Sequence, residues 1–509
     1  MSFLRACLLV LFLCVIPTFA GPRSPIKSAH PEQRAAHYFE SVRGTPELLI
    51  AFLRDMPKGG DLHNHLSGAV YAESFIDYAA SDGLCVDRTT SRLIAPPCDD
   101  GCDRFTSKSA IACAYQDHVL YNQIVDAWSM RNWIAGSESG HDHFFSTFAK
   151  FELASRLHTG DMLAEAVSRA AEDHLQYVEL MHTADDRGAA DLGRRTGWTE
   201  SLKRMRENLL AGGIRTIVAA TRQKLDSDEY KMRHDLRCGG SEADPGCAVT
   251  VRYLYQVLRG LAPEEVFAQM TLGFELVEAD ARFVGLNLVM PEDWYVPMRD
   301  FELHMRMLDY LHEIYPRVHI ALHADELAPG IVPPEGLRFH IRDSIERGHA
   351  QRIGHGVAVM NENDPFALLE EMARRDVMVE ICLTSNDLIL GVVGDHHPFS
   401  AYRRYGVPVA LATDDQGVLR SNMTTEYVRA AETYQLSYAD LKSLARQSLE
   451  HSFLPGASLW RGRGFHPVSS CAGDRSRLQS ACRRFLDANE RAREQSRLEA
   501  EFAKFENKF

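Results

Sequence analysis

The sequence has little that would suit a membrane, a fibre or a nucleic acid. Its longest unbroken apolar run, Ala6–Ile16, falls well short of the ~20 residues of a membrane-spanning helix. Lys and Arg number only 56 against 70 Asp and Glu, giving a net charge of −14, which disfavours DNA, RNA or an anionic bilayer as the main partner. Internal repeats and low-complexity segments are also lacking. The chain is 45% hydrophobic and 25% charged, which is typical of a globular protein.

The N-terminal apolar run has the context of a targeting signal. Arg5 supplies a positive charge before the run, and Thr18-Phe-Ala20 supplies small residues at the positions that a signal peptidase requires. We therefore interpret residues 1–20 as a signal peptide cleaved near Ala20, and not as a membrane anchor. The rest of the chain is expected to be exported, either secreted or periplasmic.

The distribution of cysteine agrees with export. Eight of the 11 cysteines lie in loop-like or peripheral segments: Cys85, Cys98, Cys102, Cys113, Cys238, Cys247, Cys471 and Cys482. In an oxidising compartment these favour four disulfides. Cys238 is expected to pair with Cys247, and Cys471 with Cys482, because each pair is isolated and close in sequence. The first four cysteines can pair in three ways. Cys382 lies in an apolar run and is expected to be a buried free thiol.

Short apolar, β-branched runs alternate with longer helical patterns, which predicts a parallel sheet. Eight such runs occur: Gly60–Ser67, Tyr177–His182, Arg215–Ala220, Phe283–Val289, Val318–His323, Arg352–Gly356, Val377–Thr384 and Val407–Asp414. Eight strands of this kind predict an α/β fold, a (β/α)₈ TIM barrel with its active site at the C-terminal ends of the strands.

The predicted barrel occupies residues 57–420 and carries additions. The uneven spacing of the strands predicts insertions at about 70–140 and 222–280, both of which contain cysteine. Residues 21–56 are predicted to form an N-terminal helical segment, where Thr45 and Pro46 provide an N-cap and a first helical position. Residues 421–509 are predicted to be a C-terminal helical extension.

Three imidazoles and one carboxylate are predicted to end strands of this barrel. His63 and His65 lie two residues apart in one strand, so their side chains face the same side. His323 finishes the fifth strand and Asp414 finishes the eighth. A carboxylate there is costly unless a cation or hydrogen bonds satisfy it. This set of nitrogen and oxygen donors suits zinc, which would activate a water molecule for hydrolysis.

Three more polar groups are predicted to lie beside this site. Glu326 follows His323 and is expected to act as a general acid. His355, between two glycines, is expected either to orient or to deprotonate the water, and Asp415 is expected to hydrogen-bond the water and the substrate. Each position has a simpler structural explanation, such as a core histidine or a helix cap, and His182 is interpreted as structural. The coincidence of these groups at the ends of different strands favours a metal site.

These motifs resemble those of the adenosine/AMP deaminase family of the amidohydrolase superfamily. Met56-Pro-Lys-Gly-Gly-Asp-Leu-His-Asn-His-Leu-Ser-Gly-Ala69 is similar to M-P-K-x-x-L-H-x-H-L-x-G. His323-Ala-Asp-Glu326 resembles H-A-x-E, and Arg352-Ile-Gly-His-Gly356 resembles R-I-G-H-G. Cys382-Leu-Thr-Ser-Asn386 is similar to C-P-T-S-N, and Thr413-Asp-Asp415 to T-D-D. The motifs occur in the family's order.

The resemblance implies an enzyme that converts adenosine, and deoxyadenosine, to inosine and ammonia. It implies that the zinc ligands are His63, His65, His323 and Asp414. It also implies that Glu326 protonates the purine ring, that His355 serves the water and that Asp415 binds the substrate. The fourth predicted strand lacks the lysine that bridges two metals in many amidohydrolases, so one zinc per chain is expected. The alternatives are a deaminase of another aminopurine, such as AMP or adenine, and a non-catalytic secreted binding or signalling protein.

The export signal and the cysteine-bearing insertions resemble the secreted branch of this family, the adenosine-deaminase-related growth factors. Three positions depart from the family pattern. Ser67 stands where small adenosine deaminases have Asp, and Met290 and Asp325 stand where the family usually has Gly. These departures bear on the choice of nucleoside and not on the metal chemistry. The expected partner is a small purine nucleoside, and a homodimer is one possible assembly.

Overall fold

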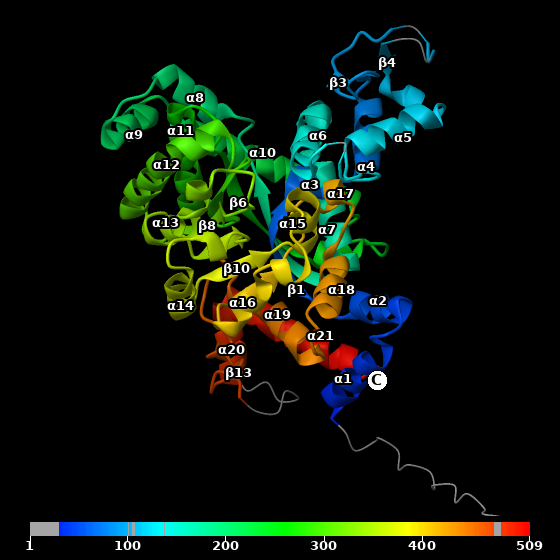
Figure 1. The fold of residues 1–509 in the computed structure, drawn as a ribbon, viewed down its shortest axis with the longest axis vertical. Coiled ribbons are helices and arrows are strands. Elements are labelled where there is room, and N and C mark those ends of the chain that lie inside the picture. Colours follow the sequence, from blue (N-terminus) through cyan, green and yellow to red (C-terminus); the bar gives the residue numbers. More distant parts are fainter. Residues whose placement is uncertain (1–29, 100, 104–106, 137, 473–479) are drawn as a thin grey trace, which may run out of the picture.

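A parallel eight-stranded sheet forms the centre of the molecule (Figure 1). The computed structural model describes residues 30–99, 101–103, 107–136, 138–472 and 480–509, so the predicted signal peptide lies outside the described residues. The strands follow one another around the sheet in chain order: β1 (Gly59–His65), β5 (Leu175–His182), β6 (Thr250–Leu258), β7 (Phe283–Val289), β8 (His319–Ala324), β9 (Arg352–His355), β10 (Met378–Ile381) and β11 (Val409–Leu411).

The first and last strands meet at their C-terminal ends. Asn64 forms a parallel bridge with Asp414. The Asp414 N–H donates to the His63 carbonyl at 2.9 Å, and the His65 N–H donates to the Asp414 carbonyl at 3.3 Å. The sheet is therefore the predicted (β/α)₈ TIM barrel with extra helices.

Helices that follow the strands cover the outside of the barrel, so strands such as β1 and β7 are buried on both faces. These helices are α7 (Thr159–Glu172), α10 (Ile214–Asp235), α11 (Pro263–Ala279), α12 (Tyr295–Ile314), α13 (His340–Glu346), α14 (Pro365–Arg375), α16 (Phe399–Arg404) and α19 (Tyr438–Glu450). The shorter helices α15 (Leu383–Leu390) and α17 (Gln416–Leu419) follow β10 and β11. Short 3₁₀ turns interrupt the loops at η3 (Pro245–Ala248), η4 (Pro334–Leu337), η5 (Val359–Asn361) and η6 (Gly394–His396).

The third barrel strand is not where the sequence analysis placed it. Arg215–Ala220 lies in the 22-residue helix α10 (Ile214–Asp235), and β6 takes the third place, between β5 and β7. The buried residues of α10 include Ile214, Val218 and Leu225, which recur at the spacing of one helix face. A short β-branched run cannot be assigned to a strand or a helix by its composition alone.

This error also displaced one predicted insertion. Residues 222–280 contain β6 and α11, which belong to the barrel. The added elements between β5 and β6 are instead α8 (Gly188–Thr196) and α9 (Leu202–Ala211), whereas α10 packs between α7 and α11 as the barrel helix of this step.

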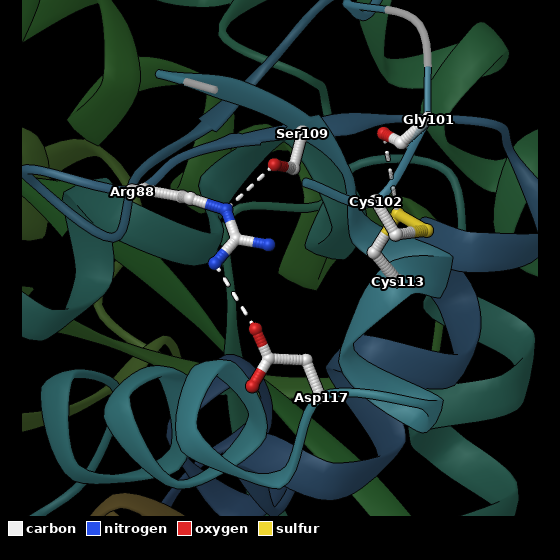
Figure 2. The surroundings of a disulfide bond; sticks show 6 residues. All are labelled: Arg88, Gly101, Cys102, Ser109, Cys113 and Asp117. Carbon is white, nitrogen blue, oxygen red and sulfur yellow. Dashed lines mark hydrogen bonds and ion pairs between the residues drawn. A yellow bond between two sulfur atoms is a disulfide. The ribbon is translucent and has the colours of Figure 1, made fainter. Parts of the chain in front are cut away.

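The other insertion, after β1, forms a small disulfide-bonded unit that projects from the barrel at the top of Figure 1. Its elements are α3 (Leu66–Ala69), α4 (Ala72–Ser81), the antiparallel strands β2 (Cys85–Asp87), β3 (Leu93–Ile94) and β4 (Lys108–Ala110), η2 (Ile111–Tyr115), α5 (His118–Ala127) and α6 (Gly140–Ser155). Figure 2 shows that Arg88 links β4 to α5, because its guanidinium donates to Ser109 and Asp117. The cysteines of this unit are too close to one another for sequence to choose their pairing, and the structure pairs Cys85 with Cys98 and Cys102 with Cys113.

The remaining cysteines follow the sequence predictions. Cys238 is bonded to Cys247, and Cys471 to Cys482. Cys382 is a free, buried thiol at the end of β10.

The two ends of the described chain pack together below the barrel (Figure 1). Aromatic contacts join Phe52 of α2 to Tyr438, Phe505 and Phe509. The elements at these ends are α1 (Pro31–Val42), α2 (Pro46–Asp55), α18 (Met423–Thr433), α19 (Tyr438–Glu450), the hairpin β12 (Trp460–Arg461) and β13 (His466–Pro467), α20 (Ser480–Ala488) and α21 (Glu490–Glu506). Within the described residues, no helix combines the length and apolar character needed to cross a bilayer.

The cysteine arrangement gives a direct prediction for the chain that begins after Ala20. A thiol reagent should not react with the native protein, since Cys382 is 1% exposed, and should modify only Cys382 after unfolding without a reductant. Mass spectrometry of the labelled peptides measures this. Rapid labelling of native Cys382, or labelling of any other cysteine before reduction, would contradict the assignment.

Candidate active site

The C-terminal ends of three strands bring the four predicted metal ligands together. His63 and His65 lie on β1, His323 on β8 and Asp414 just after β11. The Nε2 atom of His65 lies 3.3 Å from His323 Nε2 and 3.3 Å from Asp414 Oδ1, and His63 Nε2 lies 3.5 Å from the same oxygen. All four residues are buried, and one ligand atom of each lies within 4.8 Å of the others.

Each of the three imidazoles is oriented by a side-chain oxygen at its Nδ1. The pairs are His63 with Glu380 at 2.6 Å, His65 with Gln256 at 3.0 Å and His323 with Asn287 at 2.9 Å. An acceptor oxygen at Nδ1 places the ring proton there and leaves the lone pair on Nε2 free. All three Nε2 lone pairs are therefore available at one point.

The carboxylate of Asp414 completes the set. Ser385 donates its hydroxyl to Oδ2 at 2.7 Å, whereas Oδ1 has no hydrogen-bond partner, and neither has His63 Nε2. Buried polar atoms without partners are costly, and a cation between them would remove that cost. Three imidazole nitrogens and one carboxylate oxygen are a donor set that zinc accepts. The residues present therefore fit a zinc ion.

The partner of His63 is itself held in place. Arg352 donates to Glu380 Oε1 at 2.7 Å and to Glu179 Oε2 at 2.6 Å. Although burial opposes ionisation, Arg352 and His63 hold the pKa of Glu380 below its usual value. Glu380 is thus an ionised acceptor that fixes the ring of His63. The sequence analysis missed this role, and its signal was a glutamate within the otherwise apolar run of β10.

Glu326 faces the site from the loop after β8. Its Oε1 lies 3.7 Å from His355 Nε2, and it forms a buried group with His355 and Asp414. Burial, followed by the charges of Asp414 and Glu292, raises the pKa of Glu326 well above its usual value. Glu326 can therefore stay protonated near neutral pH, as a general acid must.

Asp325, the neighbour of Glu326, points elsewhere. One of its carboxylate oxygens lies 3.4 Å from His340 Nδ1 in α13. Its backbone is left-handed, with φ of 59°, a conformation that Asp tolerates and Gly favours. This geometry accounts for an Asp where the resemblance predicts Gly.

Met290 also occupies a position where the resemblance predicts Gly. Its φ is 84°, so the backbone again has the glycine-like conformation although the residue is bulky. The Met290 side chain packs over Gly260 at the end of β6, where an added Cβ would lie 2.8 Å from Met290 Cε. Ser67, the third departure, is half-buried in α3.

A buried pair that the sequence analysis missed holds the segment carrying Glu326. Glu292 accepts hydrogen bonds from the backbone N–H groups of Asp325 at 2.9 Å and Glu326 at 3.3 Å. Arg259, at the end of β6, lies 3.5 Å from Glu292 and donates to the Met290 carbonyl at 2.9 Å. The sequence analysis could not place Arg259 at the site, because it did not recognise β6 as a strand.

His355 and Asp415 complete the polar groups. His355 has φ of 66°, and burial lowers the pKa of its ring to about 3, so the ring is neutral. Asp415 Oδ1 has no hydrogen-bond partner, and burial together with neighbouring Asp414 raises the Asp415 pKa well above its usual value. Gly68 makes room for this carboxylate, because an added Cβ there would overlap Asp415. The structure thus places six of the seven predicted site residues in grouped sets of donors, and Asp415 lies beside Asp414 and within electrostatic range of Glu326. Among the described residues, His182 belongs to no such set.

Comparison with known proteins gives the same family as the motifs. The chain is 26% identical over 183 residues to an adenosine deaminase of Clostridium perfringens, which covers 35% of this chain and 51% of the relative. It is 34% identical over 200 residues to an adenine deaminase of Cupriavidus necator, with 39% and 51% covered. The chain thus spans about half the length of the curated relatives it matches.

A solved structure shares the fold. It is the structure of the N6-methyl-AMP deaminase from Arabidopsis thaliana, to which this chain is 19% identical with a TM-score of 0.51; the superposition covers 80% of this chain and 94% of that one. The family model described as adenosine deaminase matches residues 137–459, well over half of the sequence. The chain therefore belongs to the adenosine deaminase family.

Proposed function

We propose that this protein is an exported, zinc-dependent deaminase that hydrolyses adenosine to inosine and ammonia, and deoxyadenosine to the corresponding deoxynucleoside. The observation that carries the proposal is the placement of Glu326. A buried carboxyl group whose pKa is raised lies beside three imidazoles and a carboxylate that fit zinc. Hydrolysis of an aminopurine needs this combination, because the ring must gain a proton as the water attacks.

In the proposed reaction, water adds to the carbon that bears the amino group, and ammonia leaves. His63, His65, His323 and Asp414 would hold the zinc ion, which supplies Lewis-acid activation of the water when bound. Glu326 gives its proton to the adjacent ring nitrogen, so that negative charge does not build up on the ring. The two protons of the water then restore Glu326 and complete the ammonia. Asp415, with an unpartnered oxygen, binds the water and the substrate.

The substrate is proposed to be a neutral nucleoside and not a nucleotide. Asp414 is an ionised carboxylate in the site, and the chain carries a net charge of −14, so a phosphate dianion would be repelled. Relatives named adenine deaminase favour adenine as the second candidate. A non-catalytic binding protein on this fold is the remaining alternative.

Export and assembly are further parts of the proposal. Four disulfides support an oxidising destination, as expected for the secreted growth-factor branch, and cleavage near Ala20 stays a prediction. The homodimer also stays a prediction.

The substrate proposal is tested by ultraviolet absorbance. Purified protein should convert adenosine and deoxyadenosine faster than adenine or AMP, and a chelator should abolish all turnover. Faster turnover of AMP or adenine would move the assignment to that substrate, and no turnover by zinc-loaded protein would favour the binding protein.

The zinc proposal has a quantitative test. Elemental analysis should give one zinc per chain. Glu380→Gln should weaken zinc binding about 10- to 100-fold, the usual effect of losing a carboxylate that orients a ligand histidine. Competition with a chelator measures this. Glu426→Gln is the matched control, because Glu426 is equally buried but accepts from the Thr384 backbone. Two metals per chain, or equal affinities for both variants, would contradict the proposal.

The general acid is tested with neighbouring carboxylates. Glu326→Gln should keep the fold and the zinc but lose about 10²-fold or more in kcat, as expected when a general acid is removed. Asp325→Asn should lose much less, since Asp325 faces His340 and an Asn tolerates its left-handed backbone. Steady-state kinetics and zinc content measure both. Near-normal turnover by Glu326→Gln with an inactive Asp325→Asn would reverse the two roles.

A further inference from the structure

His355 sits at the end of a buried hydrogen-bond chain that starts from a backbone group. The backbone N–H of Phe399, at the start of α16, donates to His397 Nδ1 at 3.1 Å. His397 Nε2 lies 3.0 Å from Asn386 Oδ1, and Asn386 Nδ2 lies 3.0 Å from His355 Nδ1. His397, Asn386 and His355 are at most 2% exposed.

The direction of this chain can be derived from its first member. A backbone N–H can only donate, so His397 Nδ1 must be an acceptor without a proton. Burial lowers the pKa of His397 to about 4, so its ring carries one proton, which must be on Nε2. His397 therefore donates to Asn386 Oδ1, and this fixes the orientation of the amide.

The orientation of the Asn386 amide in turn determines which nitrogen of His355 carries the proton. With Oδ1 accepting from His397, the Asn386 group that faces His355 is the NH₂ group, which can only donate. His355 Nδ1 must then accept and carries no proton, so the ring proton is on Nε2. That nitrogen lies 3.7 Å from Glu326 Oε1 and has no hydrogen-bond partner in the described structure.

We propose that His397 and Asn386 are positioning residues that hold His355 in the Nε2–H form, so that His355 donates a hydrogen bond to the attacking water and does not remove its proton. This inference rests on the proposed function and decides between the two roles expected for His355. A donor at this place orients the lone pairs of the water oxygen and stabilises negative charge developing on it. The proton that the water loses is then left to Glu326, after Glu326 has given its own proton to the ring, or to Asp415.

Neutron diffraction of zinc-loaded crystals grown in heavy water tests the proton position itself. We expect deuterium on His355 Nε2 and His397 Nε2, and none on the Nδ1 atom of either ring. Deuterium on His355 Nδ1 with a bare Nε2 would overturn the proposal. This measurement does not depend on turnover, so it stands even if the protein proves not to deaminate purines.

Asn386→Asp tests the function of the proton, because it keeps the shape of the side chain and its bond from His397. The new carboxylate accepts from His355 Nδ1, moves the proton there and leaves Nε2 bare. We expect kcat to fall about 10- to 100-fold while KM changes less than about 3-fold, with zinc retained. An unchanged or higher kcat would show that His355 acts as a base and would overturn the proposal.

His397 variants separate positioning from packing. His397→Phe removes the donor and should lower kcat, whereas His397→Gln can still donate near the position of Nε2 and should recover most of the activity. In a His355→Ala background, His397→Phe should lower kcat by no more than about 2-fold, because both changes act through one residue. If His397→Phe lowered kcat as much in the His355→Ala background as in the wild type, or if His397→Gln were as impaired as His397→Phe, His397 would serve packing alone.

His319→Phe is the matched control. His319 is also an imidazole bonded to a side-chain amide, Gln351 at 2.6 Å, but it begins β8 at the opposite end of the barrel. Its replacement should leave kcat unchanged whatever it does to the melting temperature. A loss of kcat equal to that of His397→Phe would show that any histidine of this kind affects turnover indirectly, which contradicts a specific role for His397.

Discussion

The seam between β1 and β11 is the constraint on which the rest of the structure depends. It closes the barrel, and it is built from the residues that form the candidate metal site. The Thr413 hydroxyl donates to the Asp61 carboxylate at 2.5 Å, and the Asn64 amide donates to the Thr413 hydroxyl oxygen at 2.9 Å. These bonds join the strand of His63 and His65 to the segment of Asp414, so the ligand geometry is a property of the closed backbone and not of flexible side chains.

Neighbouring charged and hydrogen-bonding groups, more than burial, decide whether each carboxyl group in the site is ionised. Burial alone would make all of them neutral. Arg352 and His63 keep Glu380 ionised. Although burial opposes ionisation, the imidazoles that face Asp414, that of His63 foremost, keep the pKa of Asp414 well below its usual range. Glu326 lacks such an arrangement and has negative neighbours instead, so its pKa rises. The buried site thereby contains two ionised carboxylates, Glu380 and Asp414, and two carboxyl groups with a raised pKa, Glu326 and Asp415, which is how acid and base roles are divided in a small volume.

The sequence allowed the fold class and the grouping of site residues to be predicted, because both leave local patterns. Buried parallel strands appear in the sequence as apolar runs, and polar residues at the ends of such runs, here His323 and Asp414, are easy to recognise. The third strand could not be found, because β6 contains Arg252, Tyr253 and Gln256 and looked less strand-like than the helix before it. Residues such as Glu292 and His397 were missed for another reason: they act on backbone groups or on other side chains brought near only by the fold, and no spacing in the chain records those contacts.

The barrel seam also has a consequence for biosynthesis. Asn64 and Thr413 are bonded across 349 positions of the chain, so β1 emerges from the ribosome long before its partner exists. The disulfides, by contrast, span at most 13 positions and can close as soon as their own segments appear. Local bridges therefore form early and the barrel closes late, as expected for contacts of such different range. Until β11 arrives, the nascent chain has its imidazoles without Asp414, so the full set of four donors exists only in a closed barrel.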